Sequence, residues 1–344
     1  MTADATTATP EAAPRPRRRL RRALIWTASI LGGLVLVLAG LFLYFVWVPA
    51  PEEPDLDADV VHASLTVDGL ERTYTAVVPE GVEPGAPLWV ALHGSNMDGD
   101  GMRGATGFQL DELAVEHGFV VLYPDGYEKS WHGCRTETPY PARIDGIDDV
   151  AFLEALIGEA ASEYGSDPAR VYGVGYSNGS HMLFRMAAES PGTFAGIQAN
   201  AANYPAADNY GCEPLTEPVP TILVEGTSDP INPYEGGQAG AFGQNLGEVL
   251  SAQDSALAIA AVNGVEDEAT EEVVGGTAGE ADAVTATVYG AASDAPVALF
   301  TVEGGGHTVP NPVTQTPRIM GGGTEHLNAP VVAWELFSAL EGGE

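Results

Sequence analysis

The five residues Gly-Tyr-Ser-Asn-Gly at positions 175–179 restrict the possible folds of this chain more than any other feature of its sequence. The apolar run Val171–Val174 before them predicts a buried strand, and Ser180–Glu189 after them predicts a helix. Glycines on both sides of Ser177 allow the strand and the helix to approach closely, so the turn presents the serine hydroxyl at the edge of a sheet. The segment therefore favours folds in which strands and helices alternate around a parallel sheet.

Further apolar runs, with helical segments between them, extend this pattern along the chain. The expected strands are Val61–Val67, Thr73–Val78, Leu88–Leu92, Phe119–Tyr123, Pro220–Val224 and Val297–Val302, and the expected helices are Phe108–His117 and Asp148–Glu163. The first two strands flank Asp68-Gly69, a common turn of antiparallel hairpins. The acidic, glycine- and alanine-rich stretch 263–283 is expected to be a surface insertion or loop. The fold class is therefore α/β, with a mostly parallel central sheet and helices on both faces.

A run of 26 residues without a charged side chain, residues 23–48, lies near the N-terminus. At about 1.5 Å per residue, a helix of this length spans the roughly 30 Å hydrocarbon core of a bilayer. Six arginines within residues 15–22 predict a cytoplasmic tail over residues 1–22 and an extracytoplasmic remainder. The alternative is a cleaved signal peptide, whose apolar core is usually ~7–15 residues long. We expect an uncleaved single-pass anchor in the cell membrane, with the lipid bilayer as a partner.

Residues 49–59, PAPEEPDLDAD, are rich in proline and acidic residues and are expected to form an extended, solvated linker. The remaining residues, 60–344, form a single catalytic domain that we expect to act as a monomer. Only Asp4 and Glu11 of the 48 acidic residues precede residue 49, so this domain is strongly acidic. Its charge repels nucleic acid, and no nucleic-acid partner is expected. The acidity fits adaptation to salt or a lineage of acidic proteins, and it identifies no substrate.

The sequence contains two cysteines, Cys134 and Cys212, and neither has the spacing of a metal ligand. If the domain lies outside the cytoplasm, a single disulfide is the natural interpretation. Two free buried thiols are the alternative. A catalytic cysteine is not expected, because Ser177 is a better nucleophile candidate.

A serine hydroxyl needs a general base, and the base needs a carboxylate to orient it. His307 follows three glycines directly after the strand Val297–Val302, which places it in a loop at the sheet edge. His326 has no such strand before it, and His181 lies four residues after Ser177 on a helix that carries it away. We therefore expect His307 to be the base.

The acid and the oxyanion donors are predicted by the same reasoning. Asp229 stands in a turn after the strand Pro220–Val224 and is the expected orienting acid. The negative charge that develops on the substrate oxygen needs two N–H donors. We expect the backbone N–H of Asn178, directly after the nucleophile, and that of Ser95, in the loop after another strand. His93 is expected to brace this loop rather than to react.

The segments LHGS, GYSNG, EGTSDPINPYEGG and VEGGGHTVP, in this order, resemble the extracellular polyhydroxybutyrate depolymerase and feruloyl or acetylxylan esterase group of α/β-hydrolases. The resemblance covers roughly residues 60–340. It implies an α/β-hydrolase fold and a secreted serine esterase that uses no metal and no organic cofactor. It also implies Ser177 as nucleophile, Asp229 as acid and His307 as base, with hydrolysis through an acyl-enzyme.

The chain departs from this family at two positions. Val309 stands where the family often has a tryptophan that could stack on substrate, and Val265 stands where relatives often have a cysteine. The family's extra disulfide is therefore expected to be absent. Trp131, Tyr176, Tyr234 and Val309 are candidate substrate-lining residues, although Trp131 could instead anchor its loop.

The sequence predicts a membrane-tethered, outward-facing hydrolase of carboxylic esters, polymeric or small. Hydroxyalkanoate polyesters, feruloyl esters and acetylated sugars remain open as substrates. A peptidase on the same fold would need an anchor for a peptide terminus, which the few scattered basic residues do not provide. A non-catalytic surface-binding protein is the third alternative, and the complete set of serine, aspartate and histidine argues against it.

Overall fold

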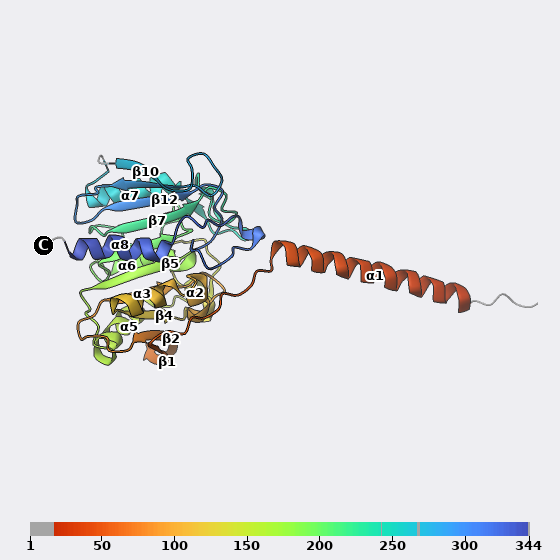
Figure 1. Cartoon of the computed structure of the whole chain (residues 1–344), viewed down its shortest axis with the longest axis horizontal. Coiled ribbons are helices and arrows are strands. Elements are labelled where there is room, and N and C mark those ends of the chain that lie inside the picture. The colour runs from red at the N-terminus through yellow and green to blue at the C-terminus, as the bar shows by residue number, and fades with distance from the viewer. Residues whose placement is uncertain (1–16, 242, 267–268, 343–344) are drawn as a thin grey trace, which may run out of the picture. The chain divides into compact units, whose positions relative to one another are not determined.

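The computed structural model describes residues 17–241, 243–266 and 269–342, and the chain divides into two units, Met1–Trp47 and Val48–Glu344 (Figure 1). The first unit contains the long helix α1 (Arg17–Phe45). Its stretch Leu20–Phe45 has a mean hydropathy of 2.3 and is long and apolar enough to cross a membrane. An N-terminal signal sequence shares these properties, so the helix fits either function.

A ten-stranded sheet forms the centre of the second unit, in the order β1-β2-β4-β3-β5-β6-β7-β12-β11-β10. Its strands are β1 (Ala58–Val67), β2 (Leu70–Pro79), β3 (Leu88–Leu92), β4 (Val120–Pro124), β5 (Val171–Tyr176), β6 (Gly196–Asn200), β7 (Thr221–Gly226), β10 (Ala269–Gly275), β11 (Val284–Tyr289) and β12 (Val297–Val302). The strands from β4 to β12 in this order are parallel, whereas β1, β2, β10 and β11 add antiparallel edges. A separate two-stranded ribbon pairs β8 (Gly237–Gln238) with β9 (Glu248–Val249).

Helices cover both faces of the sheet (Figure 1). One hydrophobic core includes residues of α5 (Asp149–Glu163), α6 (Asn178–Glu189) and α7 (Ala252–Asn263). The other includes residues of α2 (Gly99–Ala105), α3 (Gln109–His117) and α8 (Ala329–Glu341). The short helices α4 (Pro141–Ile144), η1 (Tyr127–Lys129) and η2 (Arg318–Met320) lie in loops. The central strands β3 and β4 are buried along their whole length, as parallel strands between two helical layers should be. The expected α/β-hydrolase fold is confirmed.

Most of the predicted elements match the structure, including the hairpin in which Val67 pairs with Leu70 across Asp68-Gly69. Strand β6 was not predicted, because its sequence GIQAN contains the polar residues Gln198 and Asn200. Both are buried, and their side chains donate hydrogen bonds to backbone carbonyls.

The expectation of a loop over residues 263–283 is wrong in part. Residues 269–275 of this stretch form strand β10, which pairs with β11 at one edge of the sheet. Six of its seven residues are exposed, so the sequence lacks the alternation of apolar and polar residues by which a strand is recognised.

The expectation of an extended, solvated linker over residues 49–59 is wrong only in part, because most of these residues are exposed. Val48, Pro51 and Pro54 are half-buried, and the carboxylate of Glu53 lies 2.8 Å from the guanidinium of Arg103. The strand β1 already begins at Ala58. The segment that follows the apolar helix therefore packs on the second unit, because its prolines and its acidic side chain find partners there.

Candidate active site

Ser177 lies in the sharp turn between β5 and α6, with φ 52° and ψ −110°. A non-glycine residue with this backbone conformation is strained and persists only where its surroundings hold it. The N–H of Ser177 donates to the carbonyl of Asn200 on the adjacent strand β6 at 2.9 Å. A Cβ on Gly175 would lie 2.5 Å from the Cα of Ser180, and a Cβ on Gly179 would lie 2.1 Å from the carbonyl oxygen of Leu92. Both glycines are therefore required by the close approach of strand and helix.

Asp229 and His307 lie side by side at the carboxyl ends of the neighbouring strands β7 and β12. The distance between His307 Nδ1 and Asp229 Oδ2 is 2.7 Å, and both side chains are buried. The other carboxylate oxygen of Asp229 accepts hydrogen bonds from the N–H groups of Ile231 and Asn232, at 2.7 and 2.8 Å. Because the carboxylate accepts the Nδ1 proton, the Nε2 atom of His307 is left as the basic nitrogen.

Tyr176 connects the serine turn to the histidine loop. Its hydroxyl donates to the backbone carbonyl of His307 at 3.0 Å, and the two rings have centroids 5.3 Å apart. Ser177, the next residue, is half-buried. Within the described part of the chain, Ser177 Oγ forms no hydrogen bond; such bonds often tighten only when a substrate is bound.

The two predicted oxyanion donors belong to loops that are firmly held. Asn178 accepts a hydrogen bond from the N–H of Trp131 at 2.7 Å and donates one to its carbonyl at 3.1 Å. The side chain of Ser95 accepts from the hydroxyl of Tyr140 at 3.3 Å. Neither the N–H of Asn178 nor that of Ser95 donates to a backbone acceptor in the turns and loops that the structure describes. Both N–H groups are therefore available to a ligand.

His93 braces the loop that carries Ser95, as predicted. It is fully buried, and its Nε2 accepts from the N–H of Gly126 at 2.8 Å. Its Nδ1 lies 2.7 Å from the carbonyl of Gly94 and therefore donates to it. Burial lowers the pKa of His93, which keeps the imidazole neutral. Because the ring is neutral and both of its nitrogens form hydrogen bonds, His93 has a structural function.

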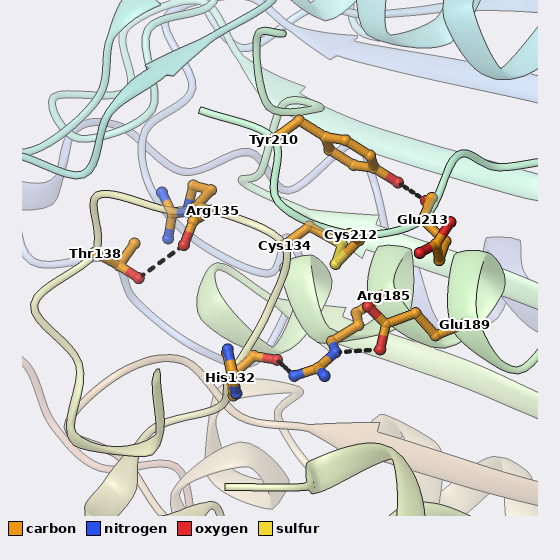
Figure 2. The surroundings of a disulfide bond; sticks show 9 residues. All are labelled: His132, Cys134, Arg135, Thr138, Arg185, Glu189, Tyr210, Cys212 and Glu213. Atoms are coloured by element: carbon orange, nitrogen blue, oxygen red, sulfur yellow. Dashed lines mark hydrogen bonds and ion pairs between the residues drawn. A yellow bond between two sulfur atoms is a disulfide. The ribbon is translucent and has the colours of Figure 1, made fainter. Parts of the chain in front are cut away.

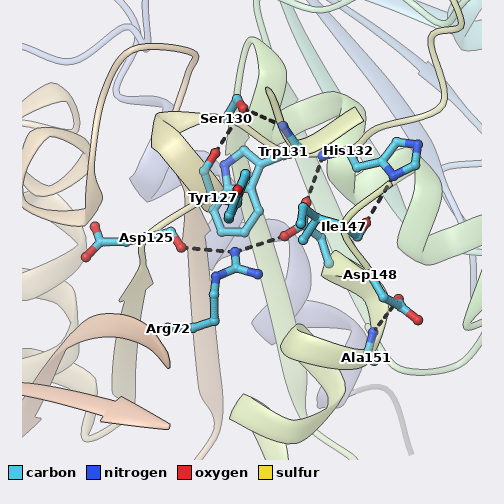
Figure 3. Close-up of polar contacts among 12 residues, drawn as sticks. Arg72, Asp125, Tyr127, Ser130, Trp131, His132, Ile147, Asp148 and Ala151 are labelled. Atoms are coloured by element: carbon cyan, nitrogen blue, oxygen red, sulfur yellow. Dashed lines mark hydrogen bonds and ion pairs between the residues drawn. The ribbon is translucent and has the colours of Figure 1, made fainter. Parts of the chain in front are cut away.

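Trp131 does not line a substrate surface, because its side chain is fully buried. Its indole N–H donates to the carbonyl of His93 at 3.0 Å. Arg72, below this loop, donates to the carbonyl of Asp125 at 3.1 Å and to the buried carboxylate of Asp149 at 2.9 Å (Figure 3). The prediction of Trp131 as a substrate residue is therefore wrong, and the tryptophan anchors its loop.

The disulfide predicted as one alternative is present. Cys134 and Cys212 are 78 residues apart in the sequence, and their Cα atoms are 5.1 Å apart. Figure 2 shows Arg185 of α6 beside the bond, donating to the carbonyl of His132 and to the carboxylate of Glu189, each at 2.8 Å. The loop next to the serine turn is thus fixed both by a covalent bond and by helix α6, which begins directly after Ser177.

A groove of about 460 Å³ opens beside His307. Its lining is mainly apolar and includes Tyr176, Val309, Met97 and Met320. Tyr176 is half-buried beside this groove and stays a candidate substrate residue, whereas Val309 is only 2% exposed and is largely covered.

Tyr234 does not line this groove. Its hydroxyl lies 2.8 Å from Thr301 Oγ1, and its ring lines a separate depression together with Gln253 and Glu303. The prediction of Tyr234 as a substrate residue is therefore wrong, because its side chain lies in this separate depression beside Thr301 and not in the groove beside His307.

The other two histidines that were considered lie outside the reacting group. His181 is buried on α6, and burial lowers its pKa well below the ordinary value. His326 is exposed, and its Nε2 lies 3.7 Å from a carboxylate oxygen of Asp282. Among the residues described, no group of three His, Cys, Asp or Glu side chains could hold a metal ion.

Glu225 was missed by the sequence reasoning, although it is fully buried four residues before Asp229. Its two carboxylate oxygens accept from the N–H of Ala202 at 2.9 Å and from the side-chain amide of Asn232 at 3.0 Å. Burial raises the pKa of Glu225 well above its ordinary value. Since Asn232 also donates to Asp229, Glu225 positions the turn that carries the acid. The available signal was an acidic residue directly after the predicted buried strand Pro220–Val224.

Comparison with known proteins relates this chain to esterases. Residues 73–204 match the family model described as esterase PHB depolymerase. NocK of Nocardia uniformis subsp. tsuyamanensis, assigned as an esterase by inference, is 29% identical over 272 residues, which cover 76% of this chain and 77% of NocK.

Two further relatives match over shorter regions. Feruloyl esterase C of Emericella nidulans is 25% identical, over 48% of this chain and 58% of its own length. Poly(3-hydroxyalkanoate) depolymerase C of Paucimonas lemoignei is 32% identical over 120 residues, which are 35% of this chain and 28% of the depolymerase. The chain therefore spans less than two thirds of the length of these two relatives. The family resemblance inferred from the sequence is confirmed.

Proposed function

We propose that this chain, a carboxylic ester hydrolase with an esterase PHB depolymerase domain over residues 73–204, uses Ser177, Asp229 and His307 as its catalytic triad. The contact of 2.7 Å between His307 and Asp229, beside the strained turn of Ser177, is the observation that carries the proposal. His307 Nε2 accepts the proton of Ser177 Oγ as the oxygen attacks the ester carbonyl. Asp229 holds the imidazole in the required tautomer and stabilises its positive charge.

The same groups complete the formation of the acyl-enzyme and then hydrolyse it. The N–H groups of Ser95 and Asn178 stabilise the negative oxygen of the tetrahedral intermediate. His307 then gives its proton to the departing alcohol, and the acyl group remains on Ser177. Water, deprotonated by His307, attacks this acyl-enzyme and releases the acid, which restores the free serine.

Two observations support an extracytoplasmic domain tethered to the membrane. The apolar helix follows a cluster of arginines, which favours a cytoplasmic N-terminus. The disulfide between Cys134 and Cys212 is typical of proteins in oxidising compartments. Protease added to intact spheroplasts should digest the catalytic domain; protection until the membrane is permeabilised would contradict this orientation.

The substrate is proposed from the chemistry of the groove and from the relatives. An apolar groove next to His307 favours esters with an apolar portion over acetylated sugars. The relative named for hydroxyalkanoate esters fits this preference, because such a polyester carries an aliphatic chain on both sides of each ester bond. A screen of feruloyl, oligo-hydroxybutyrate and acetyl-xylose esters would rank the three classes, and a clear preference for the acetylated sugar would contradict it.

The triad is tested by Ser177→Ala in the full-length protein, with Ser162→Ala as a control at an exposed position of α5. We expect Ser177→Ala to lower kcat on p-nitrophenyl acetate by at least about 10³-fold and to abolish labelling by a fluorophosphonate probe. Ser162→Ala should behave as the wild type. Labelling of Ser177→Ala at the wild-type rate would refute the proposal. A wild type that hydrolyses matched amides faster than esters would favour the peptidase alternative.

A further inference from the structure

One wall of the groove beside His307 is formed by residues that directly follow the apolar helix. Val48, Pro49, Ala50 and Pro51 line the groove together with the histidine loop. We call residues 48–51 the linker wall. Pro51 also lies next to α2, because a Cβ on Gly104 would be 4.0 Å from its Cγ and would meet no other atom within 4 Å.

An ion pair holds the linker wall in place. Arg103 Nη2 lies 2.8 Å from Glu53 and 2.8 Å from Asp111, and its Nε donates to the same Asp111 oxygen at 3.0 Å. The side chains of Arg103 and Asp111 are 7% and 0% exposed, whereas that of Glu53 is 56% exposed. The arginine is therefore fixed by the buried aspartate, and Glu53 attaches the linker wall to this fixed charge.

In the proposed mechanism, the groove is next to the group that protonates the leaving alcohol. His307, which gives its proton to the departing alcohol, lines the groove together with Thr308 and Val309. Ser95, the donor to the carbonyl oxygen, is not among its lining residues. A group that extends from the leaving oxygen would therefore enter this groove.

We propose that the linker wall forms part of the subsite for the alcohol portion of the ester, and that this subsite selects bulky apolar alcohols. The proposal rests on the proposed function, because it takes His307 as the group that protonates the leaving alcohol. The subsite's apolar lining, of proline, valine, methionine and tyrosine side chains, stabilises an aliphatic or aromatic alcohol by removing its surface from water. Residues 48–51 thereby contribute to specificity although they lie outside the sheet and its helices.

The test compares acetates of methanol, 1-hexanol and 2-naphthol with the full-length protein in phosphatidylcholine vesicles. All three esters form the same acetyl-enzyme, so differences in kcat/KM report the step in which the alcohol leaves. Each variant is compared with the wild type on each ester, which cancels the different leaving abilities of the alcohols. Titration of Ser177 with a fluorophosphonate gives the active fraction, so a partly unfolded variant is corrected for.

Three variants separate the possibilities. Glu53→Gln breaks the ion pair, and we expect it to lower kcat/KM about threefold more for 2-naphthyl acetate than for methyl acetate. Gly104→Leu extends a side chain under Pro51. We expect it to lower kcat/KM about tenfold more for 2-naphthyl acetate than for methyl acetate. Glu52→Gln is the matched control: Glu52 is exposed and has no polar partner among the described residues, so this variant should match the wild type on all three esters.

If Glu53→Gln and Glu52→Gln changed kcat/KM equally on the three esters, the assignment of the linker wall to the alcohol subsite would be overturned. If Gly104→Leu lowered kcat/KM by the same factor for all three esters, the assignment of the groove to the alcohol portion would be overturned. The labelling of Ser177→Ala decides separately whether Ser177 is the nucleophile, so failure of the subsite and failure of the proposed function are distinguishable.

Discussion

Replacement of Gly179 by alanine should damage catalysis far more than the addition of one methyl group suggests. The new Cβ would lie 2.1 Å from the carbonyl oxygen of Leu92 and 2.5 Å from its carbonyl carbon. Leu92 ends β3, which lies between β4 and β5, and it pairs directly with Gly175. The strand cannot move sideways, because both neighbouring strands are hydrogen-bonded to it.

The size of the effect follows from the overlap. Non-bonded carbon and oxygen atoms are usually at least roughly 3.3 Å apart. The end of β3 and the start of α6 must therefore separate by about 1 Å. Forcing an extra methyl group into a packed interior costs about 1–3 kcal/mol of unfolding free energy. The displaced residues lie next to the N–H groups of Ser95 and Asn178, and a misplacement of about 1 Å at a reacting centre costs about 10²-fold in rate.

Gly158→Ala provides the matched control. Gly158 is exposed within α5, and an added Cβ would meet no atom within 4 Å. Since alanine favours a helix over glycine by about 1 kcal/mol, this variant should be slightly more stable and fully active. Urea unfolding and kcat/KM on p-nitrophenyl acetate measure both variants. If Gly179→Ala keeps its rate within threefold and its stability within 0.5 kcal/mol, our account of the turn is refuted.

Two further predictions concern covalent and buried groups. Cys134→Ser combined with Cys212→Ser should lower the free energy of unfolding by about 4.5 kcal/mol, from the closure entropy of a 78-residue loop, as measured by urea unfolding against the oxidised wild type; a loss below 1 kcal/mol would contradict it. Glu225→Gln should lower the free energy of unfolding by about 1–3 kcal/mol near pH 5. Both oxygens of Glu225 accept hydrogen bonds, and glutamine replaces one of them with an NH₂ group that cannot accept. Since burial raises the folded-state pKa of Glu225, the wild type loses stability as pH rises through that pKa, and its advantage over Glu225→Gln should shrink. An advantage that grows with pH would show the opposite shift.

The sequence was sufficient to predict the turn at Ser177 and the loops of Asp229 and His307. Each of these residues directly follows an apolar strand, and the carboxyl ends of neighbouring parallel strands meet at one edge. Chain order and local pattern are therefore enough to bring them together. The same reasoning placed Asn178, because it is the next residue after the nucleophile.

The direction of loop side chains could not be predicted in this way. Trp131 and Tyr234 were chosen as aromatic residues in loops near the site, yet one is fully buried and the other lies over β12. Which way such a side chain points depends on contacts with distant residues, such as the carbonyl of His93 for Trp131 and the hydroxyl of Thr301 for Tyr234. The packing of Pro51 beside α2 depends equally on long-range contacts that the sequence pattern of the linker does not reveal.

The position of the linker wall has a consequence for any shed form of this enzyme. With the proposed membrane anchor, proteolysis after Trp47 would release a hydrolase with its proposed alcohol subsite whole, whereas proteolysis after Asp55 would release one that lacks Val48–Glu53. The two products would keep the same triad but differ in the alcohols they accept. The site of cleavage, rather than the loss of the anchor itself, would then decide what the freed enzyme digests.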